Sequence, residues 1–269
     1  MMKPRSAIGR SAGRWTALLA ATAIAGVASL SAAEADEAQA KAIFKAMSDY
    51  VSGQQAISFK FDSNLDVVTT EGQKIGLASS GAVTINRPDK IHATRTGGFA
   101  DVEFAFDGKT VTLLGKHANA YAKVNATGTI DQLVDELRDK YHRPLPAADL
   151  LMSKPYDQLM PDVVDAKDLG SGVIHGTECD HLAFRTKDFD WQIWVAQGSH
   201  PYPCRYVITS SKVNGSPEYR IDVTDWKTGA DVASDTFSPA IPANAKQMNP
   251  AELPDFDELG GIFKTKVEN

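Results

Sequence analysis

The most constraining feature of this sequence is a stretch in which apolar and polar residues alternate with a period of two. Between residues 57 and 67 one face carries Ile57, Phe59, Phe61, Leu65 and Val67, and the other carries mainly serine, lysine and aspartate. This pattern is typical of a β-strand with one buried face. Similar apolar runs, separated by turn sequences, follow at 75–85, 91–95, 102–106, 111–114 and 121–124. Strands joined by short turns predict an antiparallel meander.

Helical periodicity precedes and interrupts this meander. Apolar residues at three- and four-residue spacing predict a helix over 36–51. In the middle of the chain, Thr129 can cap a helix that reaches residue 141 and carries Leu133 and Leu137 on one stripe. Prolines then separate two shorter helical pieces, one over 147–152 and one around 159. Further strands are expected at 173–174, 182–184, 191–195, 205–209 and 219–226.

These elements predict a mainly β (α+β) fold. Because a sheet of about ten strands tends to curl, we expect a curved antiparallel sheet that forms a half-barrel. An N-terminal helix and short central lid helices would cover its concave side. An apolar concave face must be filled by helices, by a ligand or by both. Sequence alone does not separate a mobile lid from ordinary cover helices, although Met152 offers adaptable apolar surface suited to a ligand.

The first 33 residues have the features of a secretory signal peptide. Four basic residues and no acidic one lie within residues 3–14, an apolar run covers 15–30, and small residues follow at 31–33. The apolar run is shorter than the roughly 20 residues that a spanning helix needs, which disfavours a membrane anchor. We therefore expect a cleavable signal peptide over 1–33, one domain over 34–269, and a periplasmic location.

The net charge of the chain disfavours some classes of binding partner. Removal of the predicted signal peptide would change the formal net charge from −6 to −10. Nucleic acids and anionic membrane surfaces are bound mainly through lysine and arginine, so an acidic domain suits neither. We expect no nucleic-acid partner, and no later stretch is long and apolar enough to predict a membrane span.

The two cysteines, Cys179 and Cys204, are interpreted first as a disulfide, because the predicted compartment is oxidising. If the strands around them form a meander, both lie at one end of the sheet. The bond would then tie the 198–203 loop region to a strand two places away. A redox-active pair is disfavoured because the Cys-x-x-Cys spacing is absent. A zinc site that combines Cys179 with His175 and His181 is the other, less favoured alternative.

No catalytic signature is found. Asp101, Glu103 and Asp107 could act as acid–base carboxylates. They alternate with apolar residues of one strand, however, and this favours a solvated face. The sequence contains no Gly-x-Ser-x-Gly, His-Glu-x-x-His, phosphate-binding glycine loop or dinucleotide fingerprint. We expect no catalytic residues, no metal site, no cofactor and no enzyme.

Several short segments carry a resemblance to known proteins. They are residues 86–91 (Asn-Arg-Pro-Asp-Lys-Ile), 106–109 (Phe-Asp-Gly-Lys) and 121–124 (Tyr-Ala-Lys-Val). In this order they resemble the LolA/LolB-like superfamily of periplasmic lipoprotein carriers. With residues 179–185 and 203–206, the chain is more closely similar to a family of predicted periplasmic proteins, domain of unknown function 2092. The resemblance covers most of the chain after residue 33, and it implies a fold without fixing an activity.

In the lipoprotein carriers the concave face holds acyl chains beneath helical lids, so the resemblance implies a set of cavity residues. On the strands these positions would be Phe59, Phe61, Val83, Ile85, Ile91, Phe104 and Phe106. Arg95 lies on the same strand face as Ile91 and is the candidate for the carriers' lid-locking arginine. Leu133, Leu137 and Met152 on the covering helices complete the set with Trp191, for which core packing is the competing interpretation.

The expected function is a periplasmic carrier or binding protein for a lipid, an acyl chain or a lipoprotein. Two alternatives stay open. One is an envelope interaction or sensor module that binds a protein partner without lipid. The other is an enzyme whose site has no recognisable motif. An exposed apolar patch and a filled cavity would favour the interaction module.

Overall fold

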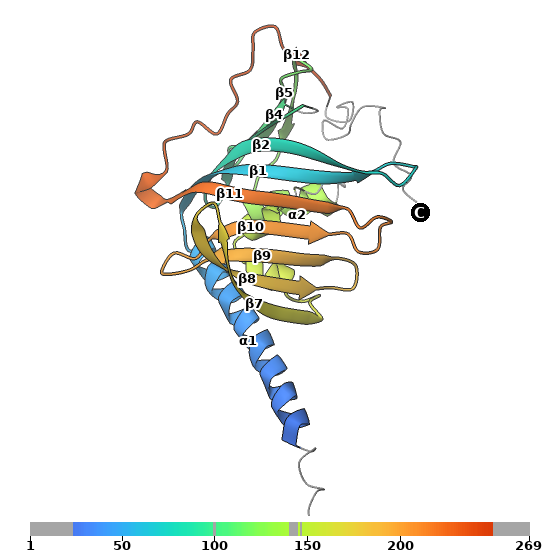
Figure 1. The fold of residues 1–269 in the computed structure, drawn as a ribbon. Coiled ribbons are helices and arrows are strands. Elements are labelled where there is room, and N and C mark those ends of the chain that lie inside the picture. The colour runs from blue at the N-terminus through green and yellow to red at the C-terminus, as the bar shows by residue number, and fades with distance from the viewer. Residues whose placement is uncertain (1–23, 99–100, 140–144, 146, 250–269) are drawn as a thin grey trace, which may run out of the picture. The chain divides into compact units, whose positions relative to one another are not determined.

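The computed structural model describes residues 24–98, 101–139, 145 and 147–249. Strands dominate the fold (Figure 1). They are β1 (Ala56–Val68), β2 (Lys74–Asn86), β3 (Lys90–Gly97), β4 (Asp101–Phe106), β5 (Thr110–Gly115), β6 (Ala120–Asn125), β7 (Asp165–Ile174), β8 (Thr177–Arg185), β9 (Asp190–Ala196), β10 (Pro203–Thr209), β11 (Glu218–Thr228) and β12 (Lys246–Gln247).

All of these strands belong to one curved, open sheet. Its order is β12-β6-β5-β4-β3-β2-β1-β11-β10-β9-β8-β7. Strands that follow one another in sequence pair antiparallel, and β1 pairs with β11, which joins the first meander to the second. The last strand, β12, lies parallel to β6. The predicted half-barrel of antiparallel strands is confirmed, whereas β12 was not expected, and β7 begins well before the predicted 173–174.

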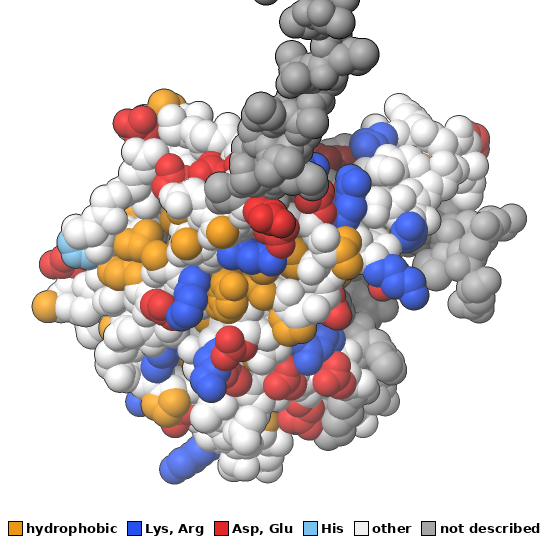
Figure 2. Space-filling view, turned by 90° about the horizontal axis from the view of Figure 1, so that it is seen from below, with side chains coloured by type: hydrophobic (Ala, Val, Ile, Leu, Met, Phe, Trp, Pro, Cys, Tyr) orange, Lys and Arg blue, Asp and Glu red, His pale blue; other side chains and the backbone are white. Residues whose placement is uncertain are grey.

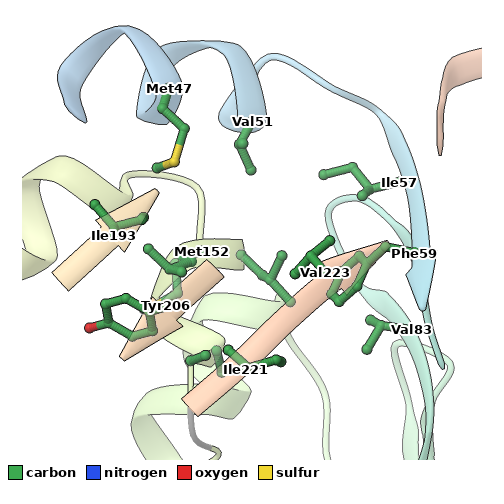
Figure 3. Packing of buried hydrophobic residues seen from close by; sticks show 14 of the residues in the cluster. Met47, Val51, Ile57, Phe59, Val83, Met152, Ile193, Tyr206, Ile221 and Val223 are labelled. Atoms are coloured by element: carbon green, nitrogen blue, oxygen red, sulfur yellow. The ribbon is translucent and has the colours of Figure 1, made fainter. Parts of the chain in front are cut away.

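The helical elements are α1 (Ile24–Ser52), α2 (Ile130–Asp139), η1 (Ala148–Leu151), α3 (Pro155–Leu159) and η2 (Gly229–Asp231). Residues 1–35 and 36–269 are separate compact units, and the sheet and short helices belong to the second. In that unit α1 buries Ala40, Phe44, Met47 and Val51 completely. The helix is confirmed but its predicted apolar stripe is not: of the residues whose spacing predicted it, Met47 is completely buried, whereas Ala38, Ala42 and Ala46 are exposed. Met47 and Val51 point from α1 into the apolar core of the sheet (Figure 3).

The N-terminal prediction lies largely outside the described residues, which begin at residue 24. The signal peptide over 1–33 and the domain limit at 34 therefore stay predictions. Among the helices of the described residues, none combines the length and the hydropathy of a membrane span.

Side-chain contacts fix the segment that covers the sheet. The Thr129 hydroxyl accepts the backbone N–H of Gln132 at 3.3 Å, and the Gln132 side chain accepts the backbone N–H of Thr129 at 2.9 Å. This reciprocal capping box starts α2 where the sequence predicted. Asp131 of α2 accepts hydrogen bonds from the backbone and the hydroxyl of Ser153. The backbone N–H of Tyr156 donates to the Ser48 hydroxyl of α1 at 2.9 Å. Residues 148–159, which contain η1 and α3 and are called the η1 segment below, are therefore attached to both α2 and α1.

The predicted disulfide joins Cys179 on β8 to Cys204 on β10, across the intervening strand β9. Both cysteines are buried in a small cluster with Ile174 and Ala196, apart from the main core. The bond therefore ties the end of the second meander together, two strands apart, as the sequence predicted.

Beside the disulfide, Asp222 of β11 accepts hydrogen bonds from Arg205 and Arg220, with distances of 2.5 to 3.0 Å. Burial alone would raise the pKa of Asp222, but the hydrogen bonds and charges of the two arginines hold it at about 2. His175 lies 3.6 Å from the same carboxylate, and His181 stacks on Trp194 with ring centroids 3.9 Å apart. The three members of the alternative zinc site are thus engaged elsewhere.

Candidate functional site

A cavity of about 240 Å³ lies between the sheet and the η1 segment. Its walls are mostly apolar, and Arg95 carries the only charged side chain among its described lining residues. The lining residues are Phe59, Phe61, Val83, Ile91, Ala93, Thr94, Arg95, Val102, Phe104, Leu113, Leu137, Leu145, Ala147, Ala148, Leu150, Leu151, Pro203, Tyr206, Tyr219, Ile221, Val223 and Trp226.

Cross-strand neighbours form the floor of this cavity in rows that run across the strands. We call one of them the middle row, and each of its five members lines the cavity. It consists of the registered neighbours Phe59, Val83, Ala93, Phe104 and Leu113 on β1 to β5. One strand face can supply such a row because side chains alternate between the two faces of a sheet.

A second row, two residues further along each strand, carries the charge. This arginine row consists of Val223, Phe61, Gly81, Arg95 and Val102. All of them except Gly81 line the cavity. The four apolar or small neighbours place the guanidinium group of Arg95 in a wall that is otherwise apolar.

Gly81 has a steric role in the arginine row. A Cβ atom at this position would lie 2.0 Å from the Thr94 carbonyl oxygen and 2.5 Å from Cζ of the Phe61 ring. No side chain fits there without displacing the backbone. The glycine therefore lets the Phe61 ring lie across β2 beside the cavity.

The rows on either side differ in polarity. The deep row, formed by Ile57, Ile85, Ile91, Phe106 and Val111, belongs to the core that packs against the helices. On the other side of the arginine row, β1 and β2 pair two buried serines, Ser63 and Ser79, whose hydroxyl oxygens are 2.9 Å apart. We call this pair the serine row. Polarity therefore increases along the strands from the deep row to the serine row.

The side wall comes from β10, β11 and the preceding loop. Trp226 stacks between Phe59 and Tyr202, with ring centroids 5.4 and 5.3 Å apart. Its Nε1–H is buried and has no hydrogen-bond partner among the described residues. Tyr206 is almost fully buried, and this burial, assisted by the charge of Asp149, raises the pKa of its hydroxyl.

The structure brings together seven of the twelve residues predicted to form the cavity. Those that line it are Phe59, Phe61, Val83, Ile91, Arg95, Phe104 and Leu137. Those that do not are Ile85, Phe106, Leu133, Met152 and Trp191, and all five are buried in the core. Ile85 and Phe106 belong to the deep row, and among the five members of that row only Ile91 lines the cavity.

The other three residues outside the cavity are also held by packing. Leu133 and Met152 lie in the same core, 6% and 0% exposed. Trp191 stacks on Phe184 with ring centroids 4.0 Å apart and makes an edge contact with Phe44 of α1. Trp191 therefore lies in the core, as the competing interpretation expected.

The predicted set of cavity residues does not include the wall formed by Tyr219, Ile221, Val223 and Trp226. The alternation of residues 219, 221 and 223 does place them on one face of β11. The pairing of β11 with β1, however, joins residues that are 154 (Leu65 and Tyr219) to 171 (Ile57 and Thr228) positions apart in the sequence. No local pattern reports such a pairing.

The carboxylates considered as acid–base candidates have structural partners instead. Glu103 contacts His92 at 2.9 Å and Lys116 at 3.2 Å, and Asp235 contacts the other ring nitrogen of His92 at 2.8 Å. Asp107 accepts the backbone N–H groups of the turn that follows it. Within the described part of the chain, no group of three or more histidine, cysteine or carboxylate side chains is placed to hold a metal ion.

Comparison with solved structures finds several similar chains, all at low sequence identity. LprF from Mycobacterium bovis is 15% identical, with a TM-score of 0.44 over 78% of this chain and 99% of that one. The MucA/MucB complex of Pseudomonas aeruginosa matches at 16% identity and a TM-score of 0.44, over 75% of this chain and 61% of the other. A LolA superfamily protein from Nitrosomonas europaea is 10% identical, with a TM-score of 0.36 over 74% and 97% of the two chains.

Comparison by sequence gives a more specific result. No curated protein matches this chain. The sequence model of the predicted periplasmic proteins named DUF2092, however, matches residues 40–249, which include all of the described strands and all of the described residues that line the cavity. The family expected from the sequence is confirmed, and the chain belongs to the DUF2092 family of predicted periplasmic proteins.

Proposed function

We propose that this protein is a periplasmic binding protein that holds a lipidic ligand, such as an acyl chain of a lipid or lipoprotein, in the cavity on its concave face. The observation that carries the proposal is the middle row. Five registered side chains on five strands all border space that the protein's own helices leave unfilled. A concave pocket with mostly apolar walls is a candidate for occupation by a ligand.

The volume of the cavity limits the binding free energy that burial of an apolar ligand can contribute. A methylene group is close in size to a water molecule, whose share of liquid volume is about 30 Å³, so 240 Å³ accommodates about eight such groups. At about 0.8 kcal/mol for each buried methylene, transfer from water contributes about 6 kcal/mol. Part of this is offset by the loss of ligand motion, so polar contacts must supply the rest of a useful affinity.

Location supports the same proposal. The family is described as periplasmic, and the basic, apolar and small-residue segments of residues 1–33 agree with export by a cleavable signal peptide. A periplasmic protein with an apolar cavity can shield an acyl chain from water between the membranes.

Tryptophan quenching by a brominated alkyl probe tests the proposal. Trp226 lines the cavity, whereas Trp194 lies with the disulfide cluster. A mid-chain dibrominated decanol should quench the wild type and the Trp194→Phe variant saturably. In the Trp226→Phe variant most of this quenching should be lost. Absence of saturable quenching in the wild type would contradict a lipid-binding cavity.

One observation favours a second candidate, the binding of an extended segment of a partner protein at the sheet edge. β7 is the end strand of the sheet, and Val164, Leu169 and Val173 on or beside it are 71%, 51% and 69% exposed. Figure 2 views the molecule from the side on which β7 lies in Figure 1, and hydrophobic side chains gather there among charged ones. An end strand offers unpaired backbone groups to an added strand.

The second candidate makes a different prediction. Backbone amides of β7 should be protected from hydrogen exchange in a host periplasmic extract and should lose that protection after purification. Equal exchange in both samples would leave no support for a partner strand.

A further inference from the structure

We infer that residues 232–248 form a strap that the charged form of His92 holds against the outer face of the sheet, and that loss of this charge releases the strap and uncovers the edge of β6. We call these residues the C-terminal strap. They follow η2 and run to β12 at the end of the sheet (Figure 1). None of them belongs to the described lining of the cavity, so the strap acts independently of the proposed lipid binding.

His92 lies on the face of β3 that is opposite the cavity. Its neighbours Ile91 and Ala93 line the cavity, and side chains alternate between the two faces of a sheet. The same alternation places Glu103 of β4 on this outer face, and the strap brings Asp235 to it. The side chains of His92, Glu103 and Asp235 are 19%, 13% and 18% exposed. Because all three are partly buried, solvent and salt screen their interaction only in part.

The imidazole ring of His92 bridges two carboxylates. Its Nδ1 lies 2.8 Å from Oδ2 of Asp235, and its Nε2 lies 2.9 Å from Oε1 of Glu103. Both ring nitrogens carry a proton only in the charged imidazolium form, whereas the neutral ring has a single N–H donor. The bridge between the strap and the sheet is therefore complete only when His92 is charged.

The charges around His92 make the strap the side that is weakened. Burial lowers the pKa of His92, but hydrogen bonds and charges from Asp235 and Glu103 outweigh burial and raise it. Nζ of Lys116 lies 3.2 Å from Oε2 of Glu103 and 3.8 Å from Oδ1 of Asp101. Glu103 thus keeps a cationic partner when His92 becomes neutral. Among the described residues, the only ion pair of Asp235 is with His92, so Asp235 loses its cation.

The other contacts of the strap are few. Phe237 is buried. β12 consists of two exposed residues, and the backbone N–H groups of Lys246 and Met248 donate to the carbonyl groups of Asn119 and Tyr121 at 2.9 and 2.8 Å. Two side-chain hydrogen bonds accompany this pairing. Short segments with few buried contacts open at low cost and as a unit, so a weaker contact at His92 lowers the cost of opening the whole strap.

Release of the strap changes the edge of the sheet. In the closed form β12 is the end strand and pairs with β6. Without β12, β6 becomes the end strand and presents unpaired backbone N–H and C=O groups to the surroundings. The charge of His92 therefore determines how often the edge of β6 is accessible.

Millisecond hydrogen exchange of the Lys246 and Met248 amides in the intact protein tests the inference. Each exchange rate is normalised to that of a free peptide of residues 239–249 at the same pH. We expect the protection of both amides to fall about 10-fold as pH rises from about 6 to about 9, because a hydrogen bond to a carboxylate is weaker when its donor is neutral. The midpoint of the fall should coincide with the titration of the His92 ring measured by NMR.

Variants identify the residue that is responsible. His92→Gln keeps a hydrogen-bond donor without a titratable charge, so protection of the two amides should be low and independent of pH. The matched control His181→Gln removes a half-buried histidine of β8 that contacts Gln192 at 2.9 Å, and it should keep the response to pH. Asp235→Asn removes the partner on the strap and should also lose the response, which provides a second test if His92→Gln folds poorly.

Two results would overturn the inference. One is protection of Lys246 and Met248 that stays constant with pH in the wild type, since the strap would then not respond to the charge of His92. The other is a fall in protection that persists in folded His92→Gln or Asp235→Asn, since a different group would then control the strap.

Discussion

Replacement of Ala93 by leucine distinguishes a true cavity from a tightly packed core. Ala93 lies at the centre of the middle row, between Val83 and Phe104, and its side chain borders the cavity. A leucine adds three carbon atoms, so it would occupy about three of the eight methylene-sized spaces. Burial of three such groups contributes at most about 2 kcal/mol to the free energy of unfolding.

The same alanine-to-leucine substitution at a position without free space should have the opposite effect on the free energy of unfolding. Ala122 is the registered neighbour of Leu113 at the end of the middle row, is 2% exposed, and does not line the cavity. Overpacking of a filled site costs about 1–3 kcal/mol. We therefore expect Ala93→Leu to be as stable as the wild type or up to about 2 kcal/mol more stable, and Ala122→Leu to be destabilised.

Urea unfolding followed by circular dichroism measures both free energies. Ala93→Leu should also bind decanol more weakly, because the leucine occupies the space of the ligand. The reasoning is refuted if Ala93→Leu is destabilised as much as Ala122→Leu, since the cavity would then behave as a packed core.

Three further predictions concern stability. Replacing both Cys179 and Cys204 by serine should lower the free energy of unfolding by about 3.5 kcal/mol, from the chain entropy of a 25-residue separation; an equal loss when the wild type is measured in reductant is the control, and no loss would contradict it. Asp222→Asn should destabilise the protein at neutral pH, because the depressed pKa of about 2 contributes stability above the unfolded pKa of about 3.9 that is lost as pH falls through 2; urea unfolding at several pH values should find the two proteins converging in acid. Burial lowers the pKa of His92, but hydrogen bonds and charges from Asp235 and Glu103 outweigh burial, so the net pKa is raised. The stability that His92 contributes is therefore fully present below its unfolded pKa of about 6.5 and is lost as pH rises through the higher folded pKa. The destabilisation caused by His92→Gln should shrink over that pH range, and a destabilisation that stays constant would contradict the assignment.

Local patterns in the sequence were sufficient to predict much of the fold, whereas the cavity residues were predicted from the resemblance to the lipoprotein carriers. The alternation of β1 gives Phe59 and Phe61 the same face, and the short turns that follow force the next strands to pair beside it. The resemblance to the lipoprotein carriers placed Val83, Ile91 and Phe104 on the concave face, and the strand pairing agrees with that placement. The capping box at Thr129 located the start of α2 from a local pattern.

Filled and hollow parts of one face cannot be distinguished from such patterns. Ile85 and Val83 alternate identically along β2, yet Ile85 packs beneath the helices and Val83 borders the cavity. The difference depends on where the helices lie across the strands, which is set by tertiary packing. The wall from β11 was missed for a similar reason, because its pairing with β1 is non-local.

The central claim is that the concave cavity holds a lipidic ligand, and the most direct test is native mass spectrometry with lipid extraction on the protein purified from the periplasm of its own host. The account predicts a bound acyl compound at near-stoichiometric amount, which the Ala93→Leu variant retains poorly. An empty protein that also fails to take up a fluorescent fatty acid would contradict the account and favour the protein-partner module.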